Sequence, residues 1–333
     1  VLYSGATVAA SLTALLVFPV AYLRSFAFAG AAVVAVACAA SVIILPALLA
    51  WMGDRIGVRD TKATESFWGR QARRVTRFPI PWAVIVTILL IVVGLPFLRF
   101  EPGRIDDRVL PEGNPARVAT DTLREDFAFR NFNGIGVIAL GADQHDDETL
   151  TEFTGQILAL DNVIRVDTPR GFFYQDNLAG RAREFNERFP GDQGIWVQVI
   201  SSQDPDDPRT EQLVRDLREL ESPYEGVELV VTGATASVLD SVDAVQSRLP
   251  LALVIIAIIT LIVLFMMTGS VVVPLKAVVL NLLSLTATFG AIVWIFQDGN
   301  FADALGFTAT GRVDVFQPIL MFCIAFGLSM DYE

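Results

Sequence analysis

The chain has 333 residues, of which 53% are hydrophobic and 19% charged, and its formal net charge is −12. It is too apolar for an ordinary soluble protein and too charged to lie wholly in lipid. Residues 99–248 hold 29 acidic side chains against 15 arginines and no lysine. That acidity excludes nucleic acid as a partner, because binding phosphates requires clustered Lys and Arg.

The first 52 residues are almost continuously apolar. Residues 5–23 and 26–51 are each long enough to cross a membrane, and Arg24-Ser25 between them predicts a transmembrane helical hairpin over residues 1–52. Ser4, Thr7 and Ser11 fall on one stripe of the first helix. We favour hydrogen bonds to the helix backbone or a neighbouring helix for these hydroxyls, with the lining of a water or proton path as the alternative.

Residues 53–78 change character abruptly and carry seven cationic side chains against three acidic ones. The positive-inside rule therefore predicts a basic cytoplasmic loop. Its residues 66–77 place aromatic residues among arginines, which is typical either of an amphipathic interfacial helix or of a plain basic juxtamembrane linker.

Residues 79–98 form the third predicted transmembrane helix, and the acidic residues 99–248 then form an extracytoplasmic domain. Within this domain we expect strands at 133–140, 163–167, 194–202 and 227–232, and amphipathic helices at 147–159 and 208–220. This order predicts an α+β, ferredoxin-like split β-α-β unit. Residues 169–193 are expected to be an inserted loop, whose Phe172, Phe173 and Tyr174 either anchor the loop or line an apolar ligand path.

Residues 249–333 are predicted to hold three more transmembrane helices, the last one truncated, so that six crossings alternate with the charges. A preceding helix, residues 234–248, feeds the first of them. Asn281, Ser284 and Thr288 again share one helical stripe. Interhelical hydrogen bonding and the lining of a hydrated route explain that stripe equally well.

The last crossing carries Asp331 and Tyr332 at the end of an apolar run. An ionised carboxylate in hydrocarbon costs about 3 kcal/mol or more, so Asp331 is expected to face a protein interior or a wet cavity. Burial raises a carboxyl pKa, which makes Asp331 the best candidate for a proton-carrying residue. It follows Gln317 by only about 21 Å of helix, against a hydrocarbon thickness of about 30 Å. Together with the apolar start of the chain, this predicts an internal piece of a longer membrane protein.

Motifs for catalysis are absent from the sequence. It has no G-x-x-x-x-G-K-[ST], H-E-x-x-H, C-x-x-C or G-x-S-x-G, and its one histidine, His145, lies in a polar, loop-like stretch. We therefore expect neither an enzyme nor a metal or other cofactor, and Cys38 and Cys323 are expected to be packing residues in apolar helices.

Several segments together resemble the MMPL family (mycobacterial membrane protein large) of the resistance-nodulation-division superfamily. They are F-G-L-S-M-D-Y-E at 326–333, P-L-K-A-V-V-L-N-L-L-S-L at 274–285, W-I-F-Q-D-G at 294–299, and L-R-S-F-A-F-A-G at 23–30 followed by L-P-A-L-L-A at 45–50. The resemblance implies a polytopic α-helical membrane protein with twelve helices in two repeated halves. This chain would run from the fifth helix to the middle of the tenth, with residues 99–248 as a porter-type domain.

The same resemblance implies a function. Members export lipids or other hydrophobic molecules across the cytoplasmic membrane, driven by the proton motive force. Asp331 and Tyr332 match an Asp-Tyr pair of the tenth helix, which pairs with a second Asp-Tyr pair of the fourth helix in the remainder of the parent chain. The alternatives are a non-transporting membrane sensor, like the sterol-sensing relatives, and a scaffold that docks envelope proteins.

Overall fold

The computed structural model describes residues 2–53, 67–126, 134–142, 147–174, 177–180 and 194–329. His145 and the predicted relay residues Asp331 and Tyr332 lie outside these residues. The chain divides into a helical unit, Val1–Ile105 with Ala244–Glu333, and a sheet unit, Asp106–Asp243. The boundary of the sheet unit thus lies inside the predicted domain of residues 99–248, and each unit is described by itself.

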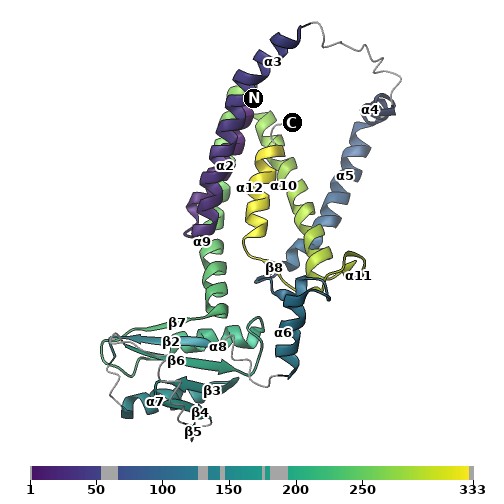
Figure 1. The fold of residues 1–333 in the computed structure, drawn as a ribbon. Helices are drawn as coiled ribbons and strands as arrows, with labels where there is room; N and C mark the ends of the chain where they lie inside the picture. The colour runs from purple at the N-terminus through teal and green to yellow at the C-terminus, as the bar shows by residue number, and fades with distance from the viewer. Residues whose placement is uncertain are drawn as a thin grey trace. The chain divides into compact units, whose positions relative to one another are not determined.

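The helical unit consists of long apolar helices (Figure 1). In chain order its elements are α1 (Leu2–Thr13), a 3-10 turn (Ala14–Val17), α2 (Ala21–Ala39), a π-helical turn (Ala40–Ile44), α3 (Leu45–Met52), α4 (Phe67–Arg77), α5 (Pro79–Gly94) and a 3-10 turn (Leu95–Arg99). They continue with α9 (Ala234–Thr268), which begins in the sheet unit, α10 (Val272–Ile292), a π-helical turn (Val293–Gln297), α11 (Ala302–Leu305) and α12 (Gln317–Ser329).

Four helical stretches among the described residues are long and apolar enough to cross a membrane. They are Ala21–Met52, Pro79–Arg99, Ala234–Thr268 and Val272–Gln297. The other two predicted crossings correspond to shorter apolar helices, Leu2–Val17 and Gln317–Ser329. The predicted feeder helix and the crossing after it form one helix, α9, of 35 residues with Pro250 inside it.

The turn of the N-terminal hairpin differs from its predicted position. The first helical segment ends at Val17, and Phe18 is extended, with ψ of 134°. Pro19 explains the break, since proline lacks an N–H and disfavours a helical conformation in the residue before it. Arg24 and Ser25, the expected turn, lie inside α2, where Arg24 Nε donates to the Phe18 carbonyl at 3.0 Å. The prediction of a break at Arg24-Ser25 was wrong. Both side chains donate hydrogen bonds to nearby backbone carbonyls, so the two polar residues can lie inside the helix.

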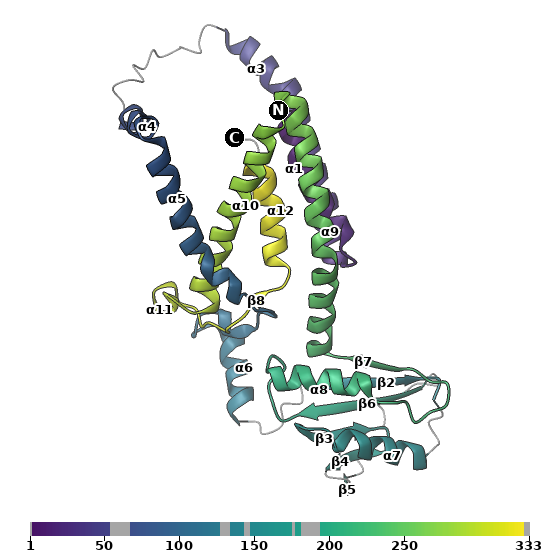
Figure 2. The same cartoon turned by 180° about the vertical axis from the view of Figure 1, so that it is seen from behind.

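Helix α12 packs against both α1 and α10, and α10 packs against α5 (Figure 2). Glycines allow the closest of these approaches. A Cβ added to Gly290 of α10 would overlap the Val93 carbonyl oxygen and lie 2.7 Å from the Cα of Gly94 in α5. Small residues at helix interfaces let backbones approach in this way, and close van der Waals packing is what associates helices in lipid.

One side chain ties together the segments that follow α5 and α10. Gln297 Oε1 accepts from the Glu101 N–H at 3.0 Å, and its Nε2 donates to the Arg99 carbonyl at 2.7 Å. Beside it, the two-residue strands β1 (Pro102–Gly103) and β8 (Val313–Asp314) pair in parallel. Gln297 is 8% exposed, so its amide satisfies backbone groups in a place with little access to water.

The sheet unit contains a six-stranded antiparallel sheet with the order β5-β4-β3-β6-β2-β7. Its elements are a 3-10 turn (Asp107–Val109), α6 (Pro115–Asp126), β2 (Ile135–Leu140), α7 (Asp147–Leu158), β3 (Val163–Thr168), β4 (Gly171–Tyr174), β5 (Asn177–Gly180), β6 (Gly194–Ser201), α8 (Pro208–Glu219) and β7 (Leu229–Thr232). The four strands β3-β6-β2-β7, with α7 and α8 as connections, have the order of a split β-α-β ferredoxin-like unit.

The predicted loop at residues 169–193 is partly a hairpin. Strands β4 and β5 extend the sheet beyond β3, with Phe173 opposite Val166. Phe173 is 8% exposed and therefore contributes to the buried side of this edge. The expectation of a loop failed here because a strand of four residues shows too few alternations to be distinguished by pattern.

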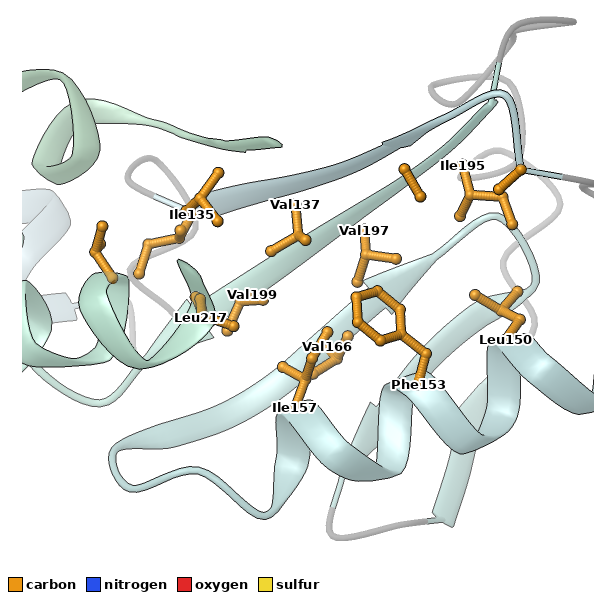
Figure 3. Close-up of a cluster of buried hydrophobic side chains, with 14 of the residues drawn as sticks. Ile135, Val137, Leu150, Phe153, Ile157, Val166, Ile195, Val197, Val199 and Leu217 are labelled. Atoms are coloured by element: carbon orange, nitrogen blue, oxygen red, sulfur yellow. The ribbon is translucent and has the colours of Figure 1, made fainter. Parts of the chain in front are cut away.

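The core of the sheet unit lies between the sheet and its two helices. In Figure 3, Phe153 and Ile157 of α7 point toward Val166 and Val197 of the sheet. The buried set is Ile135, Val137, Ala139, Ala142, Leu150, Phe153, Ile157, Val166, Ile195, Val197, Val199, Leu213, Val214, Leu217, Tyr224, Val231 and Ala236. Alternate strand residues and one helical face supply it, as the periods of 2 and 3.6 residues require.

Candidate intramembrane polar site

Helix α12 is the element that leads to the predicted relay residues. It is described as far as Ser329, and Asp331 and Tyr332 follow in the sequence. The structure therefore characterises the surroundings of α12 rather than the relay residues themselves. Those surroundings are the predicted polar stripes of α1 and α10.

On α1, the three hydroxyls of the predicted stripe have different environments. Thr7 is 3% exposed, and its Oγ1 donates to the Ser4 carbonyl at 2.8 Å, which is the backbone bonding that we favoured. Ser4 is half-buried. Ser11 is 1% exposed, and its Oγ has no hydrogen-bond partner among the described residues. A hydrogen bond to the backbone of its own helix thus accounts for the hydroxyl of Thr7 but not for that of Ser11.

Ser11 lies against a glycine of α12. A Cβ added to Gly327 would lie 3.0 Å from the Cα of Val8 and 3.4 Å from Ser11 Oγ. The missing side chain of Gly327 therefore lets α1 and α12 approach closely and places a polar atom at the contact.

On α10, the predicted stripe separates into buried and exposed residues. Asn281 is 2% exposed, and its Nδ2 donates to the Phe326 carbonyl of α12 at 3.2 Å. Ser284 and Thr288 are exposed, and Thr288 Oγ1 donates to the Ser284 carbonyl at 3.0 Å. Thr288 shares the helical face of Asn281 but lies about 10 Å along the axis, so a shared face did not give a shared environment.

Two buried polar atoms therefore flank adjacent residues of α12. They are Ser11 Oγ, beside Gly327, and Oδ1 of Asn281, whose Nδ2 donates to the Phe326 carbonyl. Within the part of the chain that the structure describes, neither oxygen has a hydrogen-bond partner. A buried polar atom left unpaired costs about 1–3 kcal/mol, and such atoms in native proteins call for an explanation. Polar groups at this depth are typical of ion and proton pathways.

Sequence reasoning missed two polar residues of the helical unit. Thr260 of α9 is 1% exposed and stands alone among apolar residues, so no stripe indicated it. Gln297 belongs to the W-I-F-Q-D-G segment, which contributed only to the family resemblance. Among the described residues, no group of three or more His, Cys, Asp or Glu side chains could hold a metal ion.

The long apolar helices and the α+β unit define a multi-pass α-helical membrane protein with an additional α+β unit. The sequence model of the MMPL family matches residues 1–82 and 109–333. The chain belongs to the MMPL family, which confirms the resemblance seen in its motifs. As a member of this family, it is a protein of the cytoplasmic membrane.

Individual relatives align along the whole chain. Membrane protein YdfJ of Bacillus subtilis (strain 168) is 32% identical, with 100% of this chain and 44% of YdfJ covered. Putative membrane protein SCO6666 of Streptomyces coelicolor is 33% identical, over 100% of this chain and 43% of that protein. Trehalose monomycolate exporter MmpL3 of Mycobacterium tuberculosis (strain H37Rv) is 27% identical, over 100% and 38%. The chain thus spans less than half the length of these relatives.

Proposed function

We propose that the protein containing this chain exports lipids or other hydrophobic molecules across the cytoplasmic membrane, driven by the proton gradient. Membership in the MMPL family supports transport, and the relative MmpL3 is by its name an exporter of trehalose monomycolate. In this proposal Asp331 and Tyr332 form half of the proton relay. A second Asp-Tyr pair elsewhere in the full-length protein forms the other half.

The observation that carries the proposal is the polar environment of α12. Ser11 and Asn281 bring buried oxygens, which have no hydrogen-bond partner in the described ranges, close to Gly327 and Phe326, four and five residues before Asp331. A carboxyl group within lipid depth needs polar neighbours or water to change its protonation state. Protonation of Asp331 would change its partners and thereby favour one of two arrangements of the helices.

The sheet unit has the strand order of a ferredoxin-like module, which supports its assignment as the extracytoplasmic porter-type domain. The basic residues 53–78 then lie on the cytoplasmic side, in accordance with the positive-inside rule. In this arrangement the hydrophobic substrate passes through the porter-type domain after leaving the membrane, and envelope proteins are candidate partners there.

The experiment compares full-length wild-type protein with Asp331→Asn in vesicles, with and without a proton gradient. The amide cannot carry the proton, so we expect gradient-dependent flux of a fluorescent lipid to disappear while insertion is unchanged. Asp303→Asn, an exposed carboxylate of α11, is the control and should transport normally. Gradient-dependent flux retained by Asp331→Asn would refute the relay, and a wild-type protein without flux would favour the sensor or scaffold.

A further inference from the structure

Helix α4 separates two kinds of side chain by face. At 100° per residue, Arg70, Arg73, Arg74 and Arg77 fall within an arc of about 100°. The opposite side carries Trp68, Ala72 and Val75, while Phe67 lies at the edge of the arginine arc and Phe78 follows the end of the helix. The helix contains no Asp or Glu, although the whole chain has a net charge of −12.

The apolar side of α4 is exposed. Trp68 is 75% exposed, Phe67 63% and Phe78 56%, and the rings of Phe67 and Trp68 contact each other at 5.3 Å. Large aromatic residues gathered on an exposed face mark an interaction surface. Tryptophan in particular is enriched at the level of lipid headgroups, where its ring meets both apolar and polar surroundings.

The backbone separates α4 from the candidate membrane span that follows it. Phe78 leaves the helical region, with φ of −133° and ψ of 66°, and α5 then starts at Pro79. Figure 2 shows α4 turned out of line with α5. An amphipathic helix that ends where an apolar span begins, with a turn between them, has the geometry of a helix lying in the membrane surface.

We propose that α4 lies in the headgroup region of the membrane and that its arginine face binds the phosphates of anionic phospholipids. Arginine presents a planar fork of donors that matches phosphate, and each basic residue near an anionic membrane surface strengthens attachment. The exposed aromatic residues point to a lipid occupant rather than a protein because the last of them, Phe78, immediately precedes the apolar span Pro79–Arg99. This inference does not depend on the proton relay.

Two adjacent positions test the proposal in the full-length protein. Val75 lies on the apolar face, and Thr76 lies about 100° away, at the border between this face and the arginine arc. Val75→Cys and Thr76→Cys are made in a background without native cysteines and reconstituted in phosphatidylcholine nanodiscs with or without phosphatidylglycerol. The reaction rate with a water-soluble maleimide is measured. We expect the Val75→Cys thiol to react at least about fivefold more slowly when phosphatidylglycerol is present, and the Thr76→Cys thiol to react readily in both lipids.

A matched pair of variants isolates the charge. Arg74→Gln with Arg77→Gln should abolish the effect of phosphatidylglycerol on Val75→Cys, whereas Arg74→Lys with Arg77→Lys should largely retain it. Equal rates for the Val75→Cys and Thr76→Cys thiols in both lipids would show that α4 is an exposed linker. Protection of Val75→Cys that is the same in both lipids and in detergent would show that protein covers the face. Either of these two results overturns the proposal.

Discussion

The side-chain amide of Asn281 donates to the backbone carbonyl of Phe326 at 3.2 Å and thereby joins α10 to α12. Both residues are 2% exposed. Because the two residues are 45 positions apart in the chain, this bond fixes the position of α12 relative to α10 shortly before Asp331 and Tyr332, the proposed relay residues. Its loss should therefore affect both stability and transport.

We expect Asn281→Ala to lower the free energy of unfolding by about 0.5–1.5 kcal/mol, which is the range of hydrogen bonds between membrane helices. Thermal unfolding of the full-length protein in nanodiscs measures this loss. Ser284→Ala removes an exposed side chain from the same helix and should change stability by less than about 0.5 kcal/mol. An Asn281→Ala protein as stable as wild type would show that the bond contributes nothing.

Gly290→Ala should disrupt the contact of α10 with α5. The added methyl group would meet the backbone of Val93 and Gly94, which cannot move without displacing α5. Overpacking of this kind costs about 1–3 kcal/mol, against a gain of up to about 1 kcal/mol from the better helix propensity of alanine.

The matched control is Gly30→Ala in α2. There the added methyl group would meet the end of the Leu12 side chain at 2.7 Å, and a side chain can change rotamer. Thermal unfolding should therefore rank Gly30→Ala above Gly290→Ala in stability. The opposite ranking would contradict the close backbone contact at Gly290.

The order of strands and helices in the sheet unit was predictable because the distribution of apolar residues within each element reflects the local backbone conformation. Strand β2 belongs to the apolar run Ile135–Leu140, in which Ile135, Val137 and Ala139 share one face and are buried. Helix α7 likewise buries Phe153 and Ile157, one turn apart, against the sheet. The apolar runs and the helical periodicity therefore identified the elements that form this core.

The environment of the intramembrane polar residues was not predictable from periodicity. Asn281 and Thr288 share one helical face, yet one is buried and the other exposed, because burial depends on where α12 contacts α10 along its length. The position of the N-terminal turn was also predicted wrongly. Pro19 disfavours a helical conformation in the residue before it, and this backbone effect determines the break more strongly than the polar pair Arg24-Ser25 does.

A buried ion pair on β3 should matter more to the sheet unit than its exposed pairs. Arg165 Nε lies 2.7 Å from Asp167 Oδ1, and Arg165 Nη2 donates to Asp167 Oδ2 at 2.9 Å, with side-chain exposures of 10% and 2%. Burial opposes the charge on Arg165, but its hydrogen bonds to Asp167 and Tyr174 outweigh that effect and leave its pKa raised. The guanidinium therefore stays charged at any ordinary pH.

Asp167→Asn would remove the carboxylate that pairs with this buried charge, and we expect a loss of about 3–5 kcal/mol in the stability of the sheet unit. Hydrogen exchange of the β3 and β6 amides in the full-length protein measures it. The control is Asp240→Asn, which breaks the more exposed pair of Asp240 with Arg218 at 2.7 Å and should cost no more than about 1 kcal/mol. Similar effects of the two variants would contradict the dependence on burial.

The contact of α6 with the turn before it should weaken in acid. Arg124 forms a two-point ion pair with Asp107, with Nη1 donating to Oδ2 at 2.8 Å. The hydrogen bond from Arg124 holds the pKa of Asp107 below its usual value of 3.8. Because the folded state has the lower pKa, this contribution to stability is fully present above about pH 4. It is lost as the pH falls through the folded-state pKa.

We therefore expect Asp107→Asn to reduce the pH dependence of unfolding at acid pH, with a stability loss at neutral pH below about 1 kcal/mol because solvent screens the pair. Urea unfolding of the full-length protein, followed by circular dichroism, gives the midpoint at pH 6 and at pH 3. The difference between wild type and Asp107→Asn should be larger at pH 6. Glu112→Gln, an exposed carboxylate near α6, should behave like wild type. A difference between wild type and Asp107→Asn that grew toward pH 3 would have the wrong sign for a carboxylate stabilised by Arg124.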